Sequence, residues 1–146
     1  MLEQIHISIG ELWDKFTILL IKKDKINDED KKKHVMNEIK VLDLFSGVGS
    51  FGIECLSRGV KKVTFIENYQ GVIPLLKKNL FSLKTIQNYE IIEKDVYSDN
   101  IFLKLKNKFD IIFLDPPYKD KNLENLLDEI KDRNILDKNG IIVLHR

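Results

Sequence analysis

From residue 40 to the end of the sequence, short apolar runs alternate with amphipathic segments. The apolar runs are of strand length, and the segments between them repeat their apolar residues at helical spacing. The predicted strands are Val41–Phe45, Val63–Ile66, Tyr89–Ile92, Phe109–Leu114 and Ile141–Leu144. The predicted helices are Phe51–Arg58, Pro74–Leu83, Asn100–Leu105 and Leu123–Arg133. This alternation predicts an α/β fold with a doubly wound parallel sheet and right-handed crossovers.

Residues 1–39 carry a different pattern, which predicts helices. Ser8 and Glu11 fit a capping box, and apolar residues then recur at helical spacing. Acidic residues at positions 28–30 indicate a second helix start, because acids favour the N-terminal end of a helix dipole. We therefore predict two units: a helical N-terminal extension over residues 1–39, folded as a helical hairpin, and an α/β domain over residues 40–146.

The composition is that of a soluble globular protein, with 43% hydrophobic residues, 32% charged residues and a net charge of +1. No strongly apolar run is longer than that of Ile18–Ile21, which is too short to span a bilayer. The single cysteine, Cys55, excludes an internal disulfide and favours a reducing compartment. The three histidines are scattered, without the spacing of metal ligands. We therefore expect a cytoplasmic protein that binds no membrane and no metal.

The fourth predicted strand ends abruptly in the tetrapeptide Asp115-Pro116-Pro117-Tyr118. Two successive prolines stiffen the backbone and remove two N–H donors, which leaves the carbonyl groups free. The carboxylate and a proline carbonyl can accept the two hydrogens of an exocyclic amine while the Tyr118 ring stacks on a planar base. The alternative is a strand that ends at proline and is followed by a surface turn, with Tyr118 covering the core.

A glycine-rich loop follows the first predicted strand and contains Gly47, Gly49 and Gly52. Glycines let the backbone pass close to a ligand, and the next helix offers the N–H groups of its first turn. Glu67 follows the second strand and Asp95 the third, at the sheet edge where ligands of such folds bind. We infer one adenosine-type ligand lying across these strands; helix capping and loop solvation are the alternative roles for the acids.

The glycine spacing also matches the dinucleotide fingerprint G-x-G-x-x-G, so this spacing alone does not identify the ligand. Asp43, at the end of the first strand, would oppose a pyrophosphate but suits a cationic amino-acid group. S-adenosylmethionine carries an ammonium, a sulfonium and an adenosine, which match the three acids. We therefore predict S-adenosyl-L-methionine, and not a nicotinamide, as the cofactor.

Three stretches, Val41–Gly59, Phe65–Glu67 and Phe113–Tyr118, closely resemble the RsmD family. These are class I S-adenosylmethionine-dependent methyltransferases that modify the N2 amine of a guanine in small-subunit ribosomal RNA. The helix end Leu-Ser-Arg-Gly, residues 56–59, favours this family over amino-methyltransferases in general. The resemblance covers roughly residues 40–146 and implies a Rossmann-like sheet of order 3-2-1-4-5.

The resemblance also implies which residues form the site. The implied catalytic residues are Asp115, Pro116, Pro117 and Tyr118. The implied cofactor-binding residues are Asp43, Phe45, Ser46, Gly47, Gly49, Ser50, Glu67, Asn68, Asp95, Val96 and Asp115.

Both ends of the sequence depart from the family pattern. Residues 1–39 lack the basic Arg-Pro-Thr segment of family members, and members continue into two further strands after the fifth. The fifth strand would then be an uncovered edge, which favours self-association through it.

The expected function is methylation of a guanine N2 amine, with ribosomal RNA or the small ribosomal subunit as partner. An amino-methyltransferase acting on adenine N6 or cytosine N4, and a truncated non-catalytic binding module, remain as alternatives.

Overall fold

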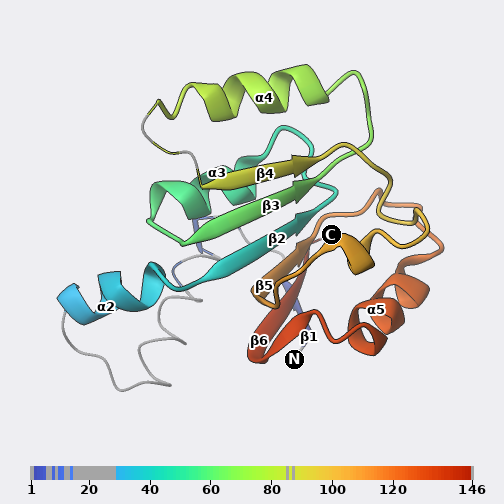
Figure 1. Cartoon of the computed structure of the whole chain (residues 1–146). Coiled ribbons are helices and arrows are strands. Elements are labelled where there is room, and N and C mark those ends of the chain that lie inside the picture. The colour runs from blue at the N-terminus through green and yellow to red at the C-terminus, as the bar shows by residue number, and fades with distance from the viewer. Residues whose placement is uncertain are drawn as a thin grey trace.

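The computed structural model describes residues 2–5, 8, 10, 11, 14, 29–84, 86 and 88–145. Within these ranges the chain forms a parallel sheet that has helices on both faces (Figure 1). The strands are β1 (Leu2–Ile5), β2 (Lys40–Leu44), β3 (Lys62–Ile66), β4 (Tyr89–Ile92), β5 (Phe109–Leu114) and β6 (Leu136–His145). The helices are α2 (Glu29–Met36), α3 (Ser50–Ser57), α4 (Ile73–Phe81), α5 (Leu123–Asp132) and the 3-10 helix η1 (Phe102–Lys104).

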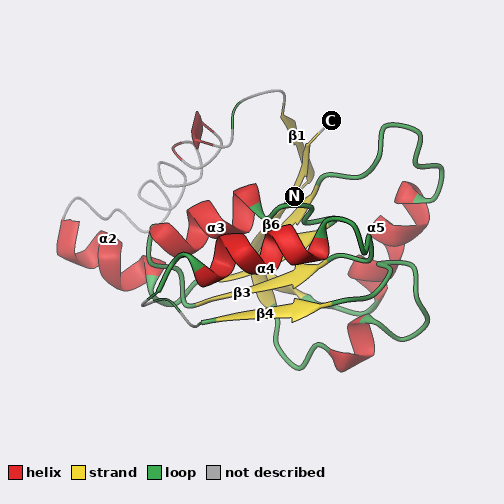
Figure 2. Ribbon diagram, turned by 90° about the horizontal axis from the view of Figure 1, so that it is seen from above, coloured by secondary structure: helices red, strands yellow, loops and turns green. Residues whose placement is uncertain are grey.

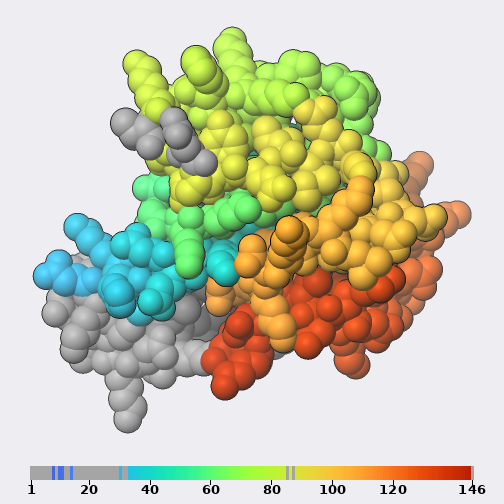
Figure 3. Space-filling model, viewed as in Figure 1, coloured from blue at the N-terminus to red at the C-terminus, as the bar shows by residue number. Residues whose placement is uncertain are grey.

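The strand order is β1-β6-β5-β2-β3-β4, and every neighbouring pair is parallel. The five strands from β2 to β6 therefore have the order 3-2-1-4-5, as predicted. In the space-filling view, α4 (yellow-green) lies at the top of the molecule and the red segment that includes β6 lies at the bottom (Figure 3).

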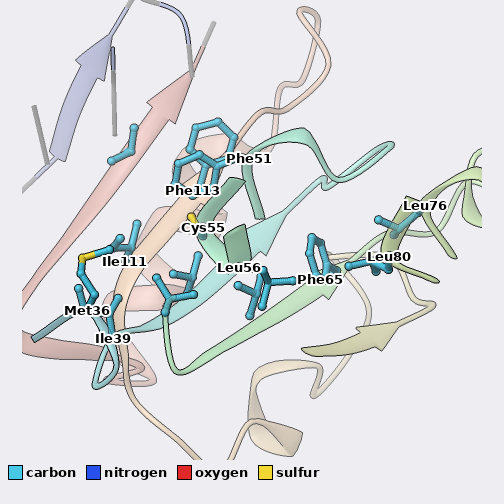
Figure 4. Close-up of a cluster of buried hydrophobic side chains, with 14 residues drawn as sticks. Met36, Ile39, Phe51, Cys55, Leu56, Phe65, Leu76, Leu80, Ile111 and Phe113 are labelled. Atoms are coloured by element: carbon cyan, nitrogen blue, oxygen red, sulfur yellow. The ribbon is translucent and has the colours of Figure 1, made fainter. Parts of the chain in front are cut away.

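Alternate residues of the central strands enter two separate hydrophobic clusters, one on each face of the sheet. Helices α3 and α4 lie together over one face (Figure 2). The cluster on that face includes Val41, Val63, Phe65, Ile111 and Phe113 from the strands and Phe51, Cys55, Leu56, Leu76 and Leu80 from the helices (Figure 4). The opposite cluster joins Leu42, Leu44, Ile66, Ile112 and Leu114 to Phe102, Leu123, Leu126 and Ile130. Burial on both faces explains why these strands read as continuous apolar runs.

The prediction that residues 1–39 are helical is wrong for Leu2–Ile5, which form strand β1. This strand pairs with the outer edge of β6, from Leu2 beside Ile142 to Ile5 beside His145. An edge strand presents unpaired N–H and C=O groups, and an extended segment of the same chain satisfies them here. The prediction that the fifth strand has an uncovered edge is therefore also wrong, because the chain's own strand occupies the surface predicted for self-association.

The predicted capping box at the first helix is confirmed. The Ser8 N–H donates to Glu11 Oε2 at 2.9 Å, and the Glu11 N–H donates to Ser8 Oγ at 3.2 Å. The rest of that predicted helix lies largely outside the described residues. Met36, at the end of α2, and Ile39 are buried in the same hydrophobic cluster as the side chains of α3 and α4. The division of the chain at residue 40 stays a prediction.

Two predicted elements differ in length from the observed ones by more than one residue. Strand β6 begins at Leu136, because Leu136 pairs with Phe109 before a register shift, and regular pairing resumes at Ile141 beside Ile111. The segment predicted as a helix over Asn100–Leu105 contains only the 3-10 turn η1. Across the described part of the chain, no helix is both long and apolar enough to cross a membrane.

Candidate active site

The predicted site residues lie in or after β2, β3, β4 and β5, whose carboxyl ends reach the same edge of the sheet because the strands are parallel. The arrowheads of β2, β3 and β4 show this common direction (Figure 1). Two cavities open at this edge. The first, of about 270 Å³, is lined by Asp43, Phe45, Ser46, Gly47, Val48, Ser50, Phe51, Phe113 and Asp115. The second, of about 190 Å³, is lined by Phe45, Ile66, Glu67, Asn68, Lys94, Asp95, Val96, Tyr97, Pro117 and Asp120.

The cavities bring together most of the residues predicted for the cofactor, but not all of the predicted site. Gly49, Pro116 and Tyr118 line neither cavity. Pro116 is buried, whereas Tyr118 is 90% exposed. Tyr118 therefore does not cover the core, which was the alternative role considered for it.

Phe45 lines both cavities and so stands at the boundary between them. Its φ angle is 57°, in the left-handed region that a bulky residue rarely adopts. Its ring packs against Tyr97 with the ring centroids 6.1 Å apart and the planes tilted by 60°. Backbone strain of this kind is often retained where a functional site requires it.

Asp43 is a buried acid at the wall of the first cavity, with a side chain only 1% exposed. Its Oδ2 accepts the Gly52 N–H at 3.1 Å. Burial raises the pKa of Asp43 from 3.8 to about 8, the Gly52 hydrogen bond lowers it, and the carboxyl groups of Asp115 and Glu67 raise it further. A cationic group in this cavity would favour the ionised carboxylate, so the lining suits a ligand that carries an ammonium or a sulfonium.

Gly52 allows α3 to pack closely against β3. A Cβ at this position would overlap the Phe65 ring and would lie 2.9 Å from Val63. The close approach keeps the first turn of α3 beside Asp43, which is how the Gly52 N–H reaches the carboxyl group.

Glu67 connects the end of β3 to the glycine loop. Its Oε2 accepts the Gly47 N–H at 2.7 Å, and its Oε1 accepts the N–H groups of Asn68 at 2.9 Å and Tyr69 at 2.8 Å. Gly47 has a φ angle of 55°, which glycine adopts without a steric cost. Glu67 thus holds the loop in place, and a carboxylate that accepts three hydrogen bonds retains a lone-pair site for a ligand hydroxyl.

Asp95 shapes the far wall of the second cavity. Its Oδ1 accepts the Tyr97 N–H at 2.9 Å, and its main-chain carbonyl accepts the Ser98 hydroxyl at 2.6 Å. These bonds fix the turn after β4, where Asp95 and Val96 line the same cavity as Asn68.

The segment Asp115–Pro117 reaches both cavities, since Asp115 lines the first cavity and Pro117 lines the second. The segment Asp115–Asp120 is held at each end by one side chain that sequence reasoning missed. Asp115 Oδ1 lies 3.1 Å from His145 Nδ1, and the Tyr97 hydroxyl donates to Asp120 Oδ2 at 2.7 Å. Burial, with the Asp120 hydrogen bond and charge, raises the pKa of Tyr97 above its ordinary range.

A signal for His145 is present in the sequence, in the alignment of two predicted strands. Placing Phe109–Leu114 and Ile141–Leu144 side by side with their ends level puts residue 145 next to residue 115. The observed pairing of Leu114 with Leu144 is this alignment. Among the described residues, no group of three or more His, Cys, Asp or Glu side chains is arranged to hold a metal ion.

Known proteins match this chain in sequence and in structure. The family model described as Conserved hypothetical protein 95 matches residues 24–146. A Haemophilus influenzae protein named Ribosomal RNA small subunit methyltransferase D is 39% identical over 111 residues, covering 73% of this chain and 56% of the relative. The protein of the same name from Buchnera aphidicola subsp. Baizongia pistaciae is 37% identical over 121 residues, covering 82% of this chain and 57% of the relative. The chain thus spans somewhat more than half the length of these curated relatives.

A solved structure extends the match over most of the fold. The crystal structure of a Haemophilus influenzae protein called "putative methylase HI0767" superposes with a TM-score of 0.69 and 32% sequence identity, covering 93% of this chain and 79% of that one. The family match and this superposition confirm the resemblance stated from the motifs: the chain belongs to the Conserved hypothetical protein 95 family, that of the RsmD-like methyltransferases.

Proposed function

We propose that the protein is an S-adenosylmethionine-dependent methyltransferase that acts on the exocyclic N2 amine of a guanine in small-subunit ribosomal RNA. One observation carries the proposal: the buried carboxyl of Asp43 and the exposed carboxyl of Asp115 line the same cavity. A cation-binding acid and an amine-accepting acid therefore lie next to each other. The names of the curated relatives support ribosomal RNA as the substrate.

The lining of the two cavities fits the proposed cofactor. Asp43 would hold the ammonium of the amino-acid part, because a buried acid suits a cation, and Ser46, Gly47 and Ser50 would lie against the rest of that part. Glu67, Asn68, Asp95 and Val96 would hold the adenosine part, with Phe45 between the two halves. The cofactor supplies an electrophilic methyl group; the protein supplies its position.

The proposed role of the Asp115 segment is to prepare a poor nucleophile. The lone pair of an aryl amine is delocalised into the ring, and accepting both N–H groups at Asp115 and the Pro116 carbonyl favours a pyramidal nitrogen. Tyr118, 90% exposed, is free to stack on the base, an interaction worth about 1–3 kcal/mol. A guanine inside a duplex would first have to be flipped out of the stack.

The test is substitution of Asp115 by alanine. We expect turnover on small-subunit ribosomal RNA to fall by about a hundredfold or more, because the amine loses its positioning acceptor, while cofactor affinity changes little. Calorimetric titration with S-adenosylmethionine and a methyl-transfer assay measure the two quantities separately. Asp128→Ala, on the exposed side of α5, is the matched control and should change neither.

Three other results of these experiments would each change the proposed function in a different way. Unchanged turnover in Asp115→Ala would refute the role of this carboxylate. Methyl transfer to DNA adenine or cytosine, and not to ribosomal RNA, would leave the chemistry in place and replace the substrate. Cofactor binding without transfer to any nucleic acid would favour a binding module.

A further inference from the structure

The carboxyl group of Asp115 has one side-chain contact that determines its orientation. His145 Nδ1 lies 3.1 Å from Asp115 Oδ1, and the two side chains are 36% and 51% exposed. Groups this accessible to water are not oriented by burial. The direction of the Asp115 carboxyl therefore depends on this contact.

His145 is itself well fixed. Its backbone belongs to β6, which pairs with β5 on one side and with β1 on the other, where His145 is level with Ile5. Its ring packs on Phe113 with the centroids 6.2 Å apart and the planes 24° apart. Phe113 in turn stacks on Phe51 of α3 at 4.0 Å, as Figure 4 shows. This chain of rings connects the imidazole to the hydrophobic core.

A second acid lies near Asp115. Asp43 and Asp115 line the same cavity, and they are close enough for Asp115 to raise the pKa of Asp43. An ionised carboxyl group only accepts hydrogen bonds, so a histidine nitrogen beside it acts as the donor. His145 meets Asp115 on the Oδ1 side of the carboxyl.

We propose that His145 is a positioning residue for the methyl-transfer reaction: its Nδ1–H holds Asp115 Oδ1, so that Oδ2 faces the substrate amine as acceptor. This inference rests on the proposed function, because it assigns a task to the same carboxylate. His145 touches neither cofactor nor substrate in this scheme, and it acts only through Asp115.

Two substitutions of His145 separate the hydrogen bond from the ring packing. His145→Phe keeps an aromatic ring on Phe113 and lacks the donor, whereas His145→Asn keeps a donor near the Nδ1 position and lacks the ring. We expect kcat to fall by about tenfold to a hundredfold in His145→Phe, with KM for the cofactor unchanged, because a misplaced catalytic group costs rate more than binding. His145→Asn should retain most of the kcat. The reverse order of the two variants would overturn the proposal and assign a packing role.

A matched control is available in α2. His34 is exposed and lies 3.6 Å from Glu38 within the same helix. His34→Phe should leave kcat and KM unchanged. A loss in His34→Phe equal to that in His145→Phe would show a general effect of removing a histidine and would overturn the proposal.

A spectroscopic readout tests the contact without any substrate. In nitrogen-15 spectra of the imidazole rings, the Nδ1 signal of His145 should move when Asp115 is replaced by asparagine, and that of His34 should not. An unmoved His145 signal would overturn the contact. If the wild-type chain transfers no methyl group, the proposed function fails while this readout still reports on the contact. If the wild-type chain is active and His145→Phe is equally active, only the positioning role fails.

Discussion

The two sides of the candidate site are built in different ways. On the side of β2 and β3, the acids are held by backbone N–H groups: Asp43 accepts from Gly52, and Glu67 accepts from Gly47, Asn68 and Tyr69. On the side of β5, Asp115 and Asp120 each contact a side chain from a neighbouring segment, and Asp120 also accepts the Asn122 N–H.

This difference separates residues that stabilise the fold from residues that affect turnover. Backbone donors belong to the fold, so a change at Asp43 or Gly52 disturbs the packing of α3 on the sheet. Side-chain donors can be removed while the sheet stays intact. We therefore expect substitutions on the first side to act mainly on the free energy of unfolding, and substitutions on the second side to act mainly on turnover.

The largest expected effect on stability concerns the pH dependence due to Asp43. The folded protein holds a proton on Asp43 up to about pH 8, whereas the unfolded chain loses it near the ordinary value of 3.8. Because the folded state binds more protons in this window, rising pH lowers the free energy of unfolding by up to about 1.4 kcal/mol per pH unit. Asp43→Asn should lack this contribution, as denaturant titrations at a series of pH values can measure.

The difference between wild-type protein and Asp43→Asn isolates the effect, because all other titrating groups are shared. The stability of the variant relative to wild type should increase as pH rises from about 4 to about 8. A difference that stays constant across this range would contradict the assignment of a raised pKa.

A smaller effect is expected from filling the space at Gly52. Gly52→Ala places a Cβ against the Phe65 ring, so the helix or the ring must shift, at a cost of about 1–3 kcal/mol. Chemical denaturation of the single variant and of the double variant with Phe65→Leu measures the coupling. Phe65→Leu should recover part of the free energy of unfolding that Gly52→Ala loses, since the two positions are in contact.

Gly47→Ala is the comparison for this steric effect. No atom lies within 4 Å of a Cβ there, and only the φ angle of 55° opposes the substitution. Phe65→Leu should therefore give no recovery in Gly47→Ala. Equal recovery in both variants would mean that the Gly52 contact is not the cause.

The smallest effect is expected at the other end of the Asp115–Asp120 segment. Tyr97→Phe removes the hydroxyl that donates to Asp120, at a cost of about 0.5–1.5 kcal/mol. Turnover should fall less than in His145→Phe, because Asp120 is not an acceptor of the amine. Thermal unfolding and methyl transfer check the two expectations, with Tyr69→Phe, at a 69% exposed position, as control. A larger loss of turnover in Tyr97→Phe than in His145→Phe would reverse the ranking.

The features that the sequence predicts well are local ones. Strands β2, β3 and β5 appear as contiguous apolar runs because both of their faces are buried. The glycine loop and the segment Asp115–Tyr118 are contiguous motifs directly after strands, and the sheet topology alone brings them to one edge. The parallel sheet, its strand order and most of the cavity lining could therefore be inferred from the sequence alone.

The features that escaped prediction depend on contacts between distant segments. Leu2–Ile5 is short and half polar, and nothing in its own pattern favours a strand over a helix; its state depends on the edge of β6. His145 looked like an isolated histidine because its partner Asp115 is remote in the sequence. Tyr97 and Asp120 likewise belong to separate loops, and side-chain hydrogen bonds between loops leave no periodic signal.

The pairing of β1 with β6 also has a consequence for the order of folding. Its contacts join the two ends of the sequence, and closing so long a loop has the largest entropic cost of any strand pair in the described chain. We expect β2 to β6 to assemble first, and β1 to pair afterwards with the outer edge of β6. On a ribosome, β1 would then dock after β2 to β6, although it is synthesised before them.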